Sequence, residues 1–135
     1  MDKILKILLI EDDKLDQIHF KRALDKRGIL YKVKIVSNGE EGLNILQNVD
    51  YKIFKDDPDM IILDVNAPKM NGREFLERLR KNKKWDNIKV FVLTNSEQEK
   101  SNFINMKISG FITKPLNFKR PTKDTISFLV DMQNI

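Results

Sequence analysis

Short runs of hydrophobic residues alternate along the chain with segments in which hydrophobic residues recur at helical spacing. Runs that are apolar at every position are typical of strands buried in a parallel sheet, and apolar residues at every third or fourth position predict amphipathic helices. The alternation of the two patterns predicts an α/β protein, with a parallel sheet covered by helices on both faces. The expected strands are residues 4–10, 33–36, 60–63, 90–93 and 111–113, and the expected helices are residues 14–27, one that follows Asn38-Gly39, one around Phe75, Leu76 and Leu79, residues 97–108, and a last one that begins near Pro121.

Five repeats of strand and helix, joined by right-handed crossovers, fit the doubly wound, flavodoxin-like (βα)5 fold with the strand order 2-1-3-4-5. The first and third strands are then neighbours at the point where the chain reverses its direction along the sheet. Ligands of such folds collect beyond the carboxyl ends of the strands at that point. A chain of 135 residues fits one domain, and we expect a single domain over residues 1–135 with no output domain.

Polar side chains stand where four of the expected strands end. Glu11 and Asp12 follow the first strand, Asp64 the third, Thr94 the fourth and Lys114 the fifth. We therefore expect three acids, a hydroxyl and an ammonium to meet at one edge of the sheet. Carboxylates this close repel one another unless a cation binds between them. Oxygen ligands without sulfur or imidazole favour Mg²⁺ or Mn²⁺.

Asp64 is the expected nucleophile because it closes the strand that is most completely apolar. Carboxylates form covalent aspartyl phosphates, and a metal ion and a lysine neutralise the charge on the phosphoryl oxygens. Lys114 supplies the ammonium, and Thr94 supplies a hydroxyl for a phosphate oxygen. Each residue alone also has a structural interpretation, as a helix cap, a surface lysine or a strand-end hydroxyl. Their common placement favours phosphoryl chemistry.

Composition excludes several other classes of protein. The chain has no cysteine, which excludes disulfides, thiolate catalysis and cysteine zinc sites. Its single histidine, His19, argues against a histidine metal site, and we interpret it as a surface or half-buried packing residue. The absence of a GxxxxGK[ST] motif argues against a P-loop enzyme. No apolar stretch approaches the roughly 20 residues of a membrane span, and no signal peptide is recognisable, so we expect a cytoplasmic protein.

The net charge of +5 comes from basic residues spread over several helices. Nucleic-acid binders usually concentrate such residues on one element, with aromatic residues among them. We therefore interpret the basic residues as solvated helix faces and expect neither DNA nor a membrane as a partner. We also expect Trp85 to cover the end of the third helix. Asp13 is expected to cap the first helix, with a metal role as the alternative.

Four stretches of the chain resemble the response-regulator receiver family of two-component signalling: ILLIEDD (7–13), ILDVNAPKMNG (62–72), FVLTNS (91–96) and GFITKPL (110–116). The resemblance extends over essentially the whole chain and is greatest to small, stand-alone, chemotaxis-regulator-like proteins, some of which pair with phytochrome-type histidine kinases.

The resemblance implies a role for each matching residue. Asp64 matches the phosphoacceptor, Glu11 and Asp12 match the acid pair, with Asp12 the direct metal ligand, and Asn66 matches the residue whose backbone carbonyl binds the metal. Further matches are Thr94 with the switch hydroxyl, Lys114 with the phosphate-binding lysine and Phe111 with the switch aromatic residue. The Lys114-Pro115 bond is often cis in this family.

The implied function is a phosphorylation switch without conventional enzymatic turnover. A sensor histidine kinase, with the phytochrome type as one candidate, offers phosphohistidine, and Asp64 accepts the phosphoryl group with Mg²⁺. Thr94 then moves toward the phosphate and Phe111 turns inward, which changes the face made by the fourth helix, fifth strand and fifth helix. The output is contact with a downstream protein, relay to a phosphotransfer partner, or homodimer formation through that face.

Two alternatives remain at this point. One is a protein-interaction module of the same fold that works without phosphorylation. The other is a magnesium-dependent aspartyl phosphatase, although such enzymes usually carry the nucleophile on the first strand. The chain also departs from the family pattern at Ala67, at Asn71 and at Lys107-Ile108, which replaces a common Gly-Ala pair. The last departure affects the fourth helix and its exit loop.

Overall fold

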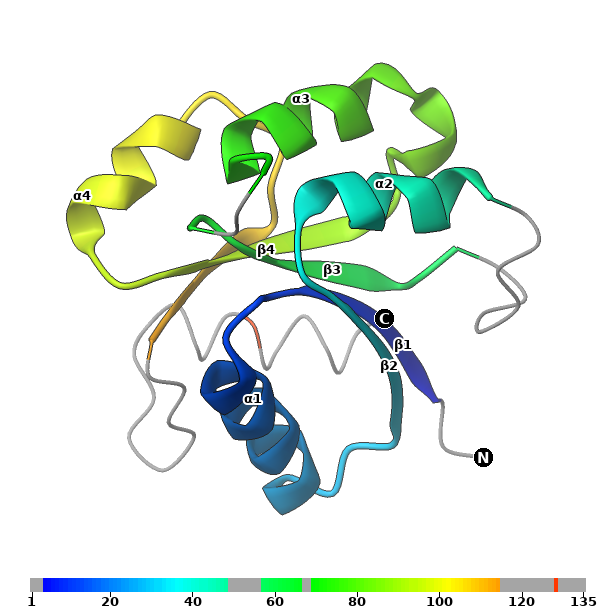
Figure 1. Ribbon diagram of the computed structural model, residues 1–135, viewed down its shortest axis with the longest axis vertical. Helices are drawn as coiled ribbons and strands as arrows, with labels where there is room; N and C mark the ends of the chain where they lie inside the picture. Colours follow the sequence, from blue (N-terminus) through cyan, green and yellow to red (C-terminus); the bar gives the residue numbers. More distant parts are fainter. Residues whose placement is uncertain (1–3, 49–56, 67–68, 115–127, 129–135) are drawn as a thin grey trace.

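Strands and helices alternate along the chain in the computed structural model, which describes residues 4–48, 57–66 and 69–114 together with Phe128 (Figure 1). The elements are β1 (Leu5–Ile10), α1 (Lys14–Lys26), β2 (Tyr31–Val36), α2 (Gly39–Gln47), β3 (Met60–Asp64), α3 (Gly72–Lys81), the 3-10 helix η1 (Lys83–Trp85), β4 (Lys89–Thr94), α4 (Glu97–Lys100), the 3-10 helix η2 (Ser101–Phe103) and β5 (Gly110–Thr113).

The strands form one five-stranded parallel sheet in the order β2-β1-β3-β4-β5. This confirms the predicted order 2-1-3-4-5. β1 and β3 lie side by side, with Ile10 paired to Leu63. On the far side of β3, β4 pairs with the outermost strand β5 so that Thr94 lies opposite Thr113. The carboxyl ends of β1, β3, β4 and β5 therefore lie along the same end of the sheet.

Hydrophobic residues cover both faces of the sheet, as the pattern predicts. On one face α2 and α3 pack against the strands, and Leu43 and Phe75 are among the buried residues (Figure 1). On the other face α1 packs through Phe20, and Phe128 stacks edge-on against Phe91 with ring centroids 4.9 Å apart. Successive strand residues face opposite cores, which explains why the central strands are apolar at every position.

Side-chain caps fix where three of the helices begin. The Asp13 side chain accepts a hydrogen bond from the backbone N–H of Asp16 at 3.0 Å, which confirms the predicted cap of α1. Asn38 caps α2 and Asn71 caps α3 in the same way. Each cap satisfies a backbone donor that has no partner within the helix. The caps also hold the strand-to-helix loops in place beside the strand ends.

The fourth helix is shorter than predicted. The pattern predicts a helix over residues 97–108, but α4 and η2 together end at Phe103, and no helix follows before β5. The reason is tertiary contact. The Arg80 guanidinium donates a hydrogen bond to the backbone oxygen of Lys107, and the N–H of Ser109 donates to the backbone oxygen of Val90. These bonds hold the segment in turns and irregular structure instead of a helix, at the position where the sequence departs from the family pattern.

The remaining expectations differ in outcome. β2 begins at Tyr31, two residues before the predicted range 33–36, because it pairs with the full length of β1. Trp85 is buried next to α3 as expected. The predicted last helix near Pro121 and the Lys114-Pro115 bond lie outside the described residues, apart from Phe128. Among the helices described, none has both the length and the hydrophobicity needed to cross a bilayer.

Candidate functional site

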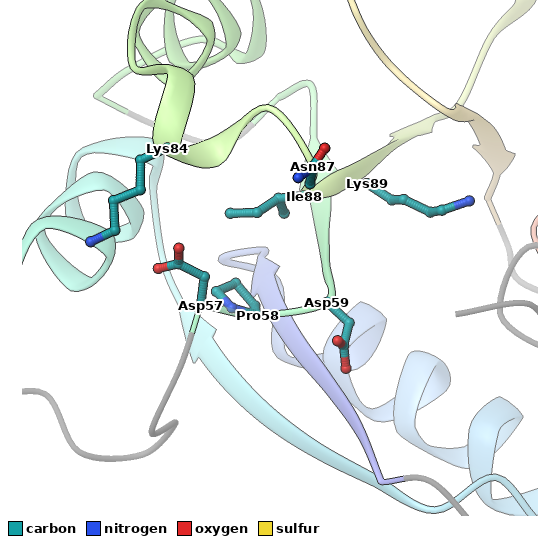
Figure 2. A pocket seen from close by; sticks show the side chains of 7 residues that line it. All are labelled: Asp57, Pro58, Asp59, Lys84, Asn87, Ile88 and Lys89. Carbon is teal, nitrogen blue, oxygen red and sulfur yellow. The ribbon is translucent and has the colours of Figure 1, made fainter.

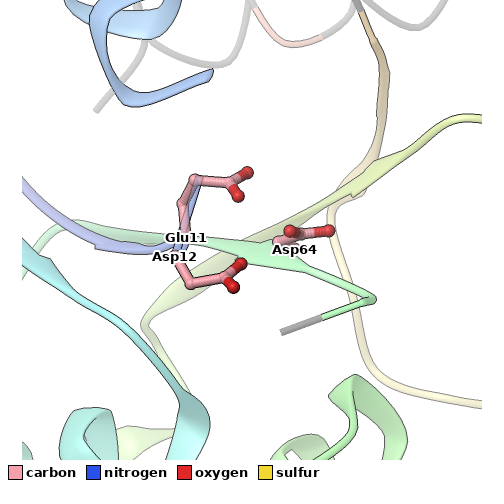
Figure 3. Close-up of side chains that lie close together, drawn as sticks. All are labelled: Glu11, Asp12 and Asp64. Atoms are coloured by element: carbon pink, nitrogen blue, oxygen red, sulfur yellow. The ribbon is translucent and has the colours of Figure 1, made fainter. Parts of the chain in front are cut away.

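Three carboxylates gather where β1 and β3 end. Glu11 and Asp12 directly follow β1, and Asp64 is the last residue of β3. Each offers an oxygen within 4.8 Å of the others, and Figure 3 shows the three side chains next to one another. Glu11 and Asp64 are buried, whereas Asp12 is exposed. The expectation that these acids meet is confirmed, and one side of the cluster is open to solvent.

Lys114 brings an ammonium into this cluster from the end of β5. Its backbone N–H donates to the backbone oxygen of Thr94 at 2.9 Å, which ties it to the end of β4. Its Nζ lies 2.9 Å from Glu11 Oε2 and 3.3 Å from Asp64 Oδ2. The side chain is largely buried, so the ion pairs are less screened by water than surface pairs are. The predicted meeting of the lysine with the acids is therefore observed.

Glu11 carries the least satisfied carboxylate of the cluster. Its Oε1 accepts a hydrogen bond from the backbone N–H of Asp13 at 3.1 Å. Its Oε2 is buried and forms an ion pair with Lys114 Nζ at 2.9 Å, and no hydrogen bond to Oε2 is found within the described part of the chain. Burial raises the pKa of Glu11 to about 7; the Lys114 contact opposes this rise and nearby Asp64 adds to it. The site therefore has a buried carboxylate oxygen that depends on the ammonium of Lys114 as its partner.

The ammonium of Lys114 stays charged at neutral pH. Burial alone lowers the pKa of Lys114, but its contacts with Glu11, Asp16 and Asp64 outweigh burial and raise the pKa above the ordinary value. One cation then faces several carboxylates, so the cluster has an excess of negative charge. Oxygen donors with such an excess fit a hard divalent cation such as Mg²⁺ or Mn²⁺.

The loop after β3 holds Asp64 in a fixed orientation. The backbone N–H of Asn66 donates to Asp64 Oδ1 at 3.1 Å, and the N–H of Val65 donates to the backbone oxygen of Leu93. Asn66 is exposed and lies two residues after Asp64, and its backbone carbonyl as a metal ligand stays a prediction. Lys69 adopts a left-handed conformation with φ of 68°, which turns the chain toward α3. Ala67, a departure from the family pattern, lies outside the described residues.

Thr94 and Phe111, the two predicted switch residues, contact the chain around α4. The buried Thr94 hydroxyl donates to the backbone oxygen of Ser96 at 3.0 Å and accepts from the Ser96 N–H at 3.2 Å. The half-buried Phe111 ring lies edge-on to Phe103, with centroids 6.3 Å apart, and Lys100 Nζ lies 5.5 Å from the Phe111 centroid. Both predicted residues thus contact the stretch from Ser96 to Phe103, which contains α4 and η2.

Asp16, on the first turn of α1, is a site residue that sequence reasoning missed. Its Oδ2 accepts a hydrogen bond from Lys114 Nζ at 2.9 Å, although the two residues are 98 positions apart. An acid in the first turn of a helix is ordinary, because it complements the helix dipole. The sequence therefore carried no signal that distinguished Asp16 from a surface residue. His19, further along α1, is half-buried, in line with its interpretation as a packing residue.

A separate crevice of about 370 Å³ opens at the other end of the sheet, near the start of β3 and β4 (Figure 2). Two acids and two lysines are among its lining residues, which are Asp57, Pro58, Asp59, Lys84, Asn87, Ile88 and Lys89. Opposite charges are equal in number there. Within the described residues, the cluster at the carboxyl ends is the one group of three acids with metal-ligand spacing, so we place the candidate chemistry there.

Comparison with known proteins gives matches that span the chain. The sequence profile described as "Response regulator receiver domain" matches residues 7–124. The nitrate/nitrite response regulator protein NarL of Escherichia coli is 31% identical over 110 residues, which are 82% of this chain and 48% of NarL. The chain therefore spans about half the length of that curated relative.

Two further relatives are closer in length. The response regulator Rcp1 of Synechocystis sp. is 31% identical over 115 residues, which are 84% of this chain and 78% of Rcp1. The solved structure of the Mn²⁺-bound form of Rcp1 matches 97% of this chain and 93% of its own, at 28% identity and a TM-score of 0.73. The phosphorylated cyanobacterial phytochrome response regulator RcpA matches 98% of this chain and 92% of its own, at 29% identity and a TM-score of 0.74.

Proposed function

The chain belongs to the response regulator receiver domain family of two-component signalling, and from that premise we propose that it is a phosphorylation switch whose phosphoacceptor is Asp64. The observation that carries the proposal is the meeting of this buried, oriented carboxylate with a lysine ammonium and with two further acids, Glu11 and Asp12. A nucleophile, a cation and a set of metal ligands are the groups that transfer of a phosphoryl group to a carboxylate requires.

Asp64 attacks the phosphohistidine of a sensor histidine kinase. An oxygen of its carboxylate forms a bond to phosphorus while the phosphorus–nitrogen bond breaks. The electron pair of that bond stays on the imidazole nitrogen, which takes up a proton from solvent. The N–H of Asn66 holds Asp64 Oδ1 in place, and Lys114 Nζ, 3.3 Å from Oδ2, neutralises charge on the transferred oxygens.

Glu11, Asp12 and Asp64 would hold a divalent cation, with the backbone carbonyl of Asn66 as a further ligand. Mg²⁺ or Mn²⁺ at this place supplies positive charge to the phosphoryl oxygens. Two features support the assignment: the excess of carboxylates over ammonium groups, and the buried Glu11 Oε2 that accepts no hydrogen bond within the described part of the chain. Mn²⁺ in the Rcp1 structure supports it from a relative.

Phosphorylation is read out through Thr94 and Phe111. The Thr94 hydroxyl binds Ser96 in the resting protein, so it has to exchange this partner for a phosphoryl oxygen. That movement shifts the start of α4 and frees space into which the Phe111 ring turns. The face that includes α4 and β5 then changes its shape, and it contacts a downstream protein, a phosphotransfer partner or a second copy of the chain.

The partner kinase is proposed to be of the phytochrome type. The support comes from the relatives, because RcpA is a phytochrome response regulator and matches nearly the whole chain. The proposed location of the switch is the cytoplasm, where sensor kinases present their phosphohistidine.

Phosphorylation by a small donor tests the proposed function without the cognate kinase. The protein is incubated with phosphoramidate and MgCl₂, and its intact mass is measured. We expect one added phosphoryl group that hydroxylamine removes, and no addition in Asp64→Asn. The matched control is Asp59→Asn at the opposite end of β3, since an amide oxygen there can still accept the hydrogen bond from the Lys6 N–H. Unchanged labelling of Asp64→Asn, or no labelling of the unaltered protein, contradicts the proposal.

A further inference from the structure

Asp16 reaches the candidate site from a different element than the other acids. It lies on the first turn of α1, and its Oδ2 accepts a hydrogen bond from Lys114 Nζ at 2.9 Å. It does not belong to the acid cluster with metal-ligand spacing, which consists of Glu11, Asp12 and Asp64. The carboxylate of Asp16 therefore acts on the lysine and not on the proposed metal ion.

The contacts of Lys114 show what Asp16 does to it. An ammonium has three N–H donors, and three carboxylates lie within reach: Glu11 and Asp16 at 2.9 Å and Asp64 at 3.3 Å. Asp16 accepts a hydrogen bond from the ammonium at 2.9 Å, which is as short as the ion pair with the buried Glu11. Asp16 and Glu11 therefore hold the ammonium from two different elements, and Asp64 is its longer contact.

The backbone of Asp16 is fixed at the start of α1. Its backbone N–H is bound by the Asp13 side chain at 3.0 Å, and it stands at the start of a regular helix. Lys114, in contrast, carries its charge at the end of a flexible four-carbon stem, and ordering such a side chain opposes binding. A carboxylate that is carried on a fixed backbone and already orders the stem lowers that cost in the phosphorylation step.

We propose that Asp16 is a positioning residue that holds the Lys114 ammonium beside Asp64 before the phosphoryl group arrives. The inference rests on the proposed function, since it gives a role to a residue that acts through the phosphate-binding lysine. With Asp16 in place, the ammonium needs only a short movement from Asp64 Oδ2 to a phosphoryl oxygen. Without it, the stem samples other rotamers and the ammonium is absent from the site for part of the time.

The first test compares rates of phosphorylation by phosphoramidate in the presence of MgCl₂. We expect Asp16→Ala to slow labelling about tenfold, because a hydrogen bond between charged groups is lost. Mg²⁺ affinity measured by titration calorimetry should stay within about twofold, because Asp16 is not among the clustered acids. The control is Asp25→Ala, which removes an exposed acid of the same helix and should leave the rate unchanged.

A double-mutant comparison distinguishes positioning from a general effect of charge. In a Lys114→Met background, Asp16→Ala should cause no further loss, because the group on which Asp16 acts is gone. The proposal is overturned if Asp16→Ala slows labelling equally in the unaltered and the Lys114→Met backgrounds. It is also overturned if Asp16→Ala alone is labelled at the rate of the unaltered protein.

A second measurement does not depend on phosphorylation. The ζ-nitrogen resonance of Lys114 in ¹⁵N-lysine-labelled protein reports how well its ammonium is ordered. We expect a protected resonance in the unaltered protein and in Asp25→Ala, and its loss in Asp16→Ala. A resonance that persists in Asp16→Ala overturns the inference. If the three proteins show the expected resonances but the unaltered protein accepts no phosphoryl group, the proposed function fails while the positioning of Lys114 by Asp16 stands.

Discussion

The buried carboxyl of Glu11 should make the metal-free protein less stable at neutral pH than in mild acid. Burial raises the pKa of this carboxyl from 4.5 to about 7, and the contact with Lys114 only partly opposes the rise. Between these two pH values the folded protein keeps a proton that the unfolded chain has lost. The folded state thus binds more protons, and the free energy of unfolding falls as the pH rises. The stabilisation is complete below pH 4.5 and is lost above about pH 7.

The size of the effect follows from the pKa values. Each pH unit between them is worth about 1.4 kcal/mol, so the difference between 7 and 4.5 corresponds to about 3 kcal/mol in total. Most of it, about 2 to 3 kcal/mol, falls between pH 5 and pH 8. Lys114 adds no slope in this range, because its raised pKa changes stability only at alkaline pH. The loss is large against the stability of about 5–15 kcal/mol of a typical domain.

Urea unfolding of the protein and of Glu11→Gln in EDTA measures this effect. Glutamine keeps an oxygen that can accept from the Asp13 N–H but does not titrate. We expect the unaltered protein to lose about 2 to 3 kcal/mol relative to the variant between pH 5 and pH 8. The control is Glu40→Gln, an exposed acid on α2, which should show no such change. A relative loss below about 1 kcal/mol, or a relative gain, refutes the reasoning.

Two other predictions concern packing and metal binding. Gly42→Ala should destabilise the protein by about 1–3 kcal/mol in urea unfolding, because an added Cβ would lie 2.9 Å from Ile10 Cδ1. This loss would outweigh the preference of about 1 kcal/mol that alanine ordinarily has over glycine in a helix. A more stable variant would show that α2 can move away from the sheet. Mg²⁺ at ten times its dissociation constant should add about 1.4 kcal/mol of stability and raise the Tm, and Asp12→Asn should weaken this response. An equal Tm increase in that variant would place the ion elsewhere.

Fold prediction succeeded here because the central strands are buried on both faces. Val90–Leu93 and Met60–Leu63 have no polar position, and each is followed by a polar residue where the strand ends. The uninterrupted apolar runs therefore locate both strands. α4 shows the limit of that approach. The pattern predicts a helix over residues 97–108, but the bond from Arg80 to the Lys107 oxygen keeps the end of this stretch out of a helix. A bond between positions 27 apart leaves no trace in local spacing.

The site residues divide in the same way, into those that the sequence pattern could place and one that it could not. Glu11, Asp12 and Asp64 could be placed together because parallel strands deliver their carboxyl ends to one edge. Asp16 could not, since its role depends on the side chain of Lys114 crossing from β5 to α1. The order of the strands determines which strand ends are neighbours, but it does not determine which way a four-carbon side chain points. Only the packed structure shows that.

The pH slope and the metal response share one cause. The buried carboxylate of Glu11 is costly when charged, because Lys114 offsets its burial only in part, and a divalent cation would stabilise the charged form. Binding of the cation should therefore release the Glu11 proton and be weaker at pH 5 than at pH 8. Saturating Mg²⁺ should also reduce the loss of stability between pH 5 and pH 8, because the charged carboxylate then has a second cation beside it in addition to Lys114. If the slope stays the same with and without Mg²⁺, Glu11 does not take part in binding the ion, and its raised pKa reflects burial alone.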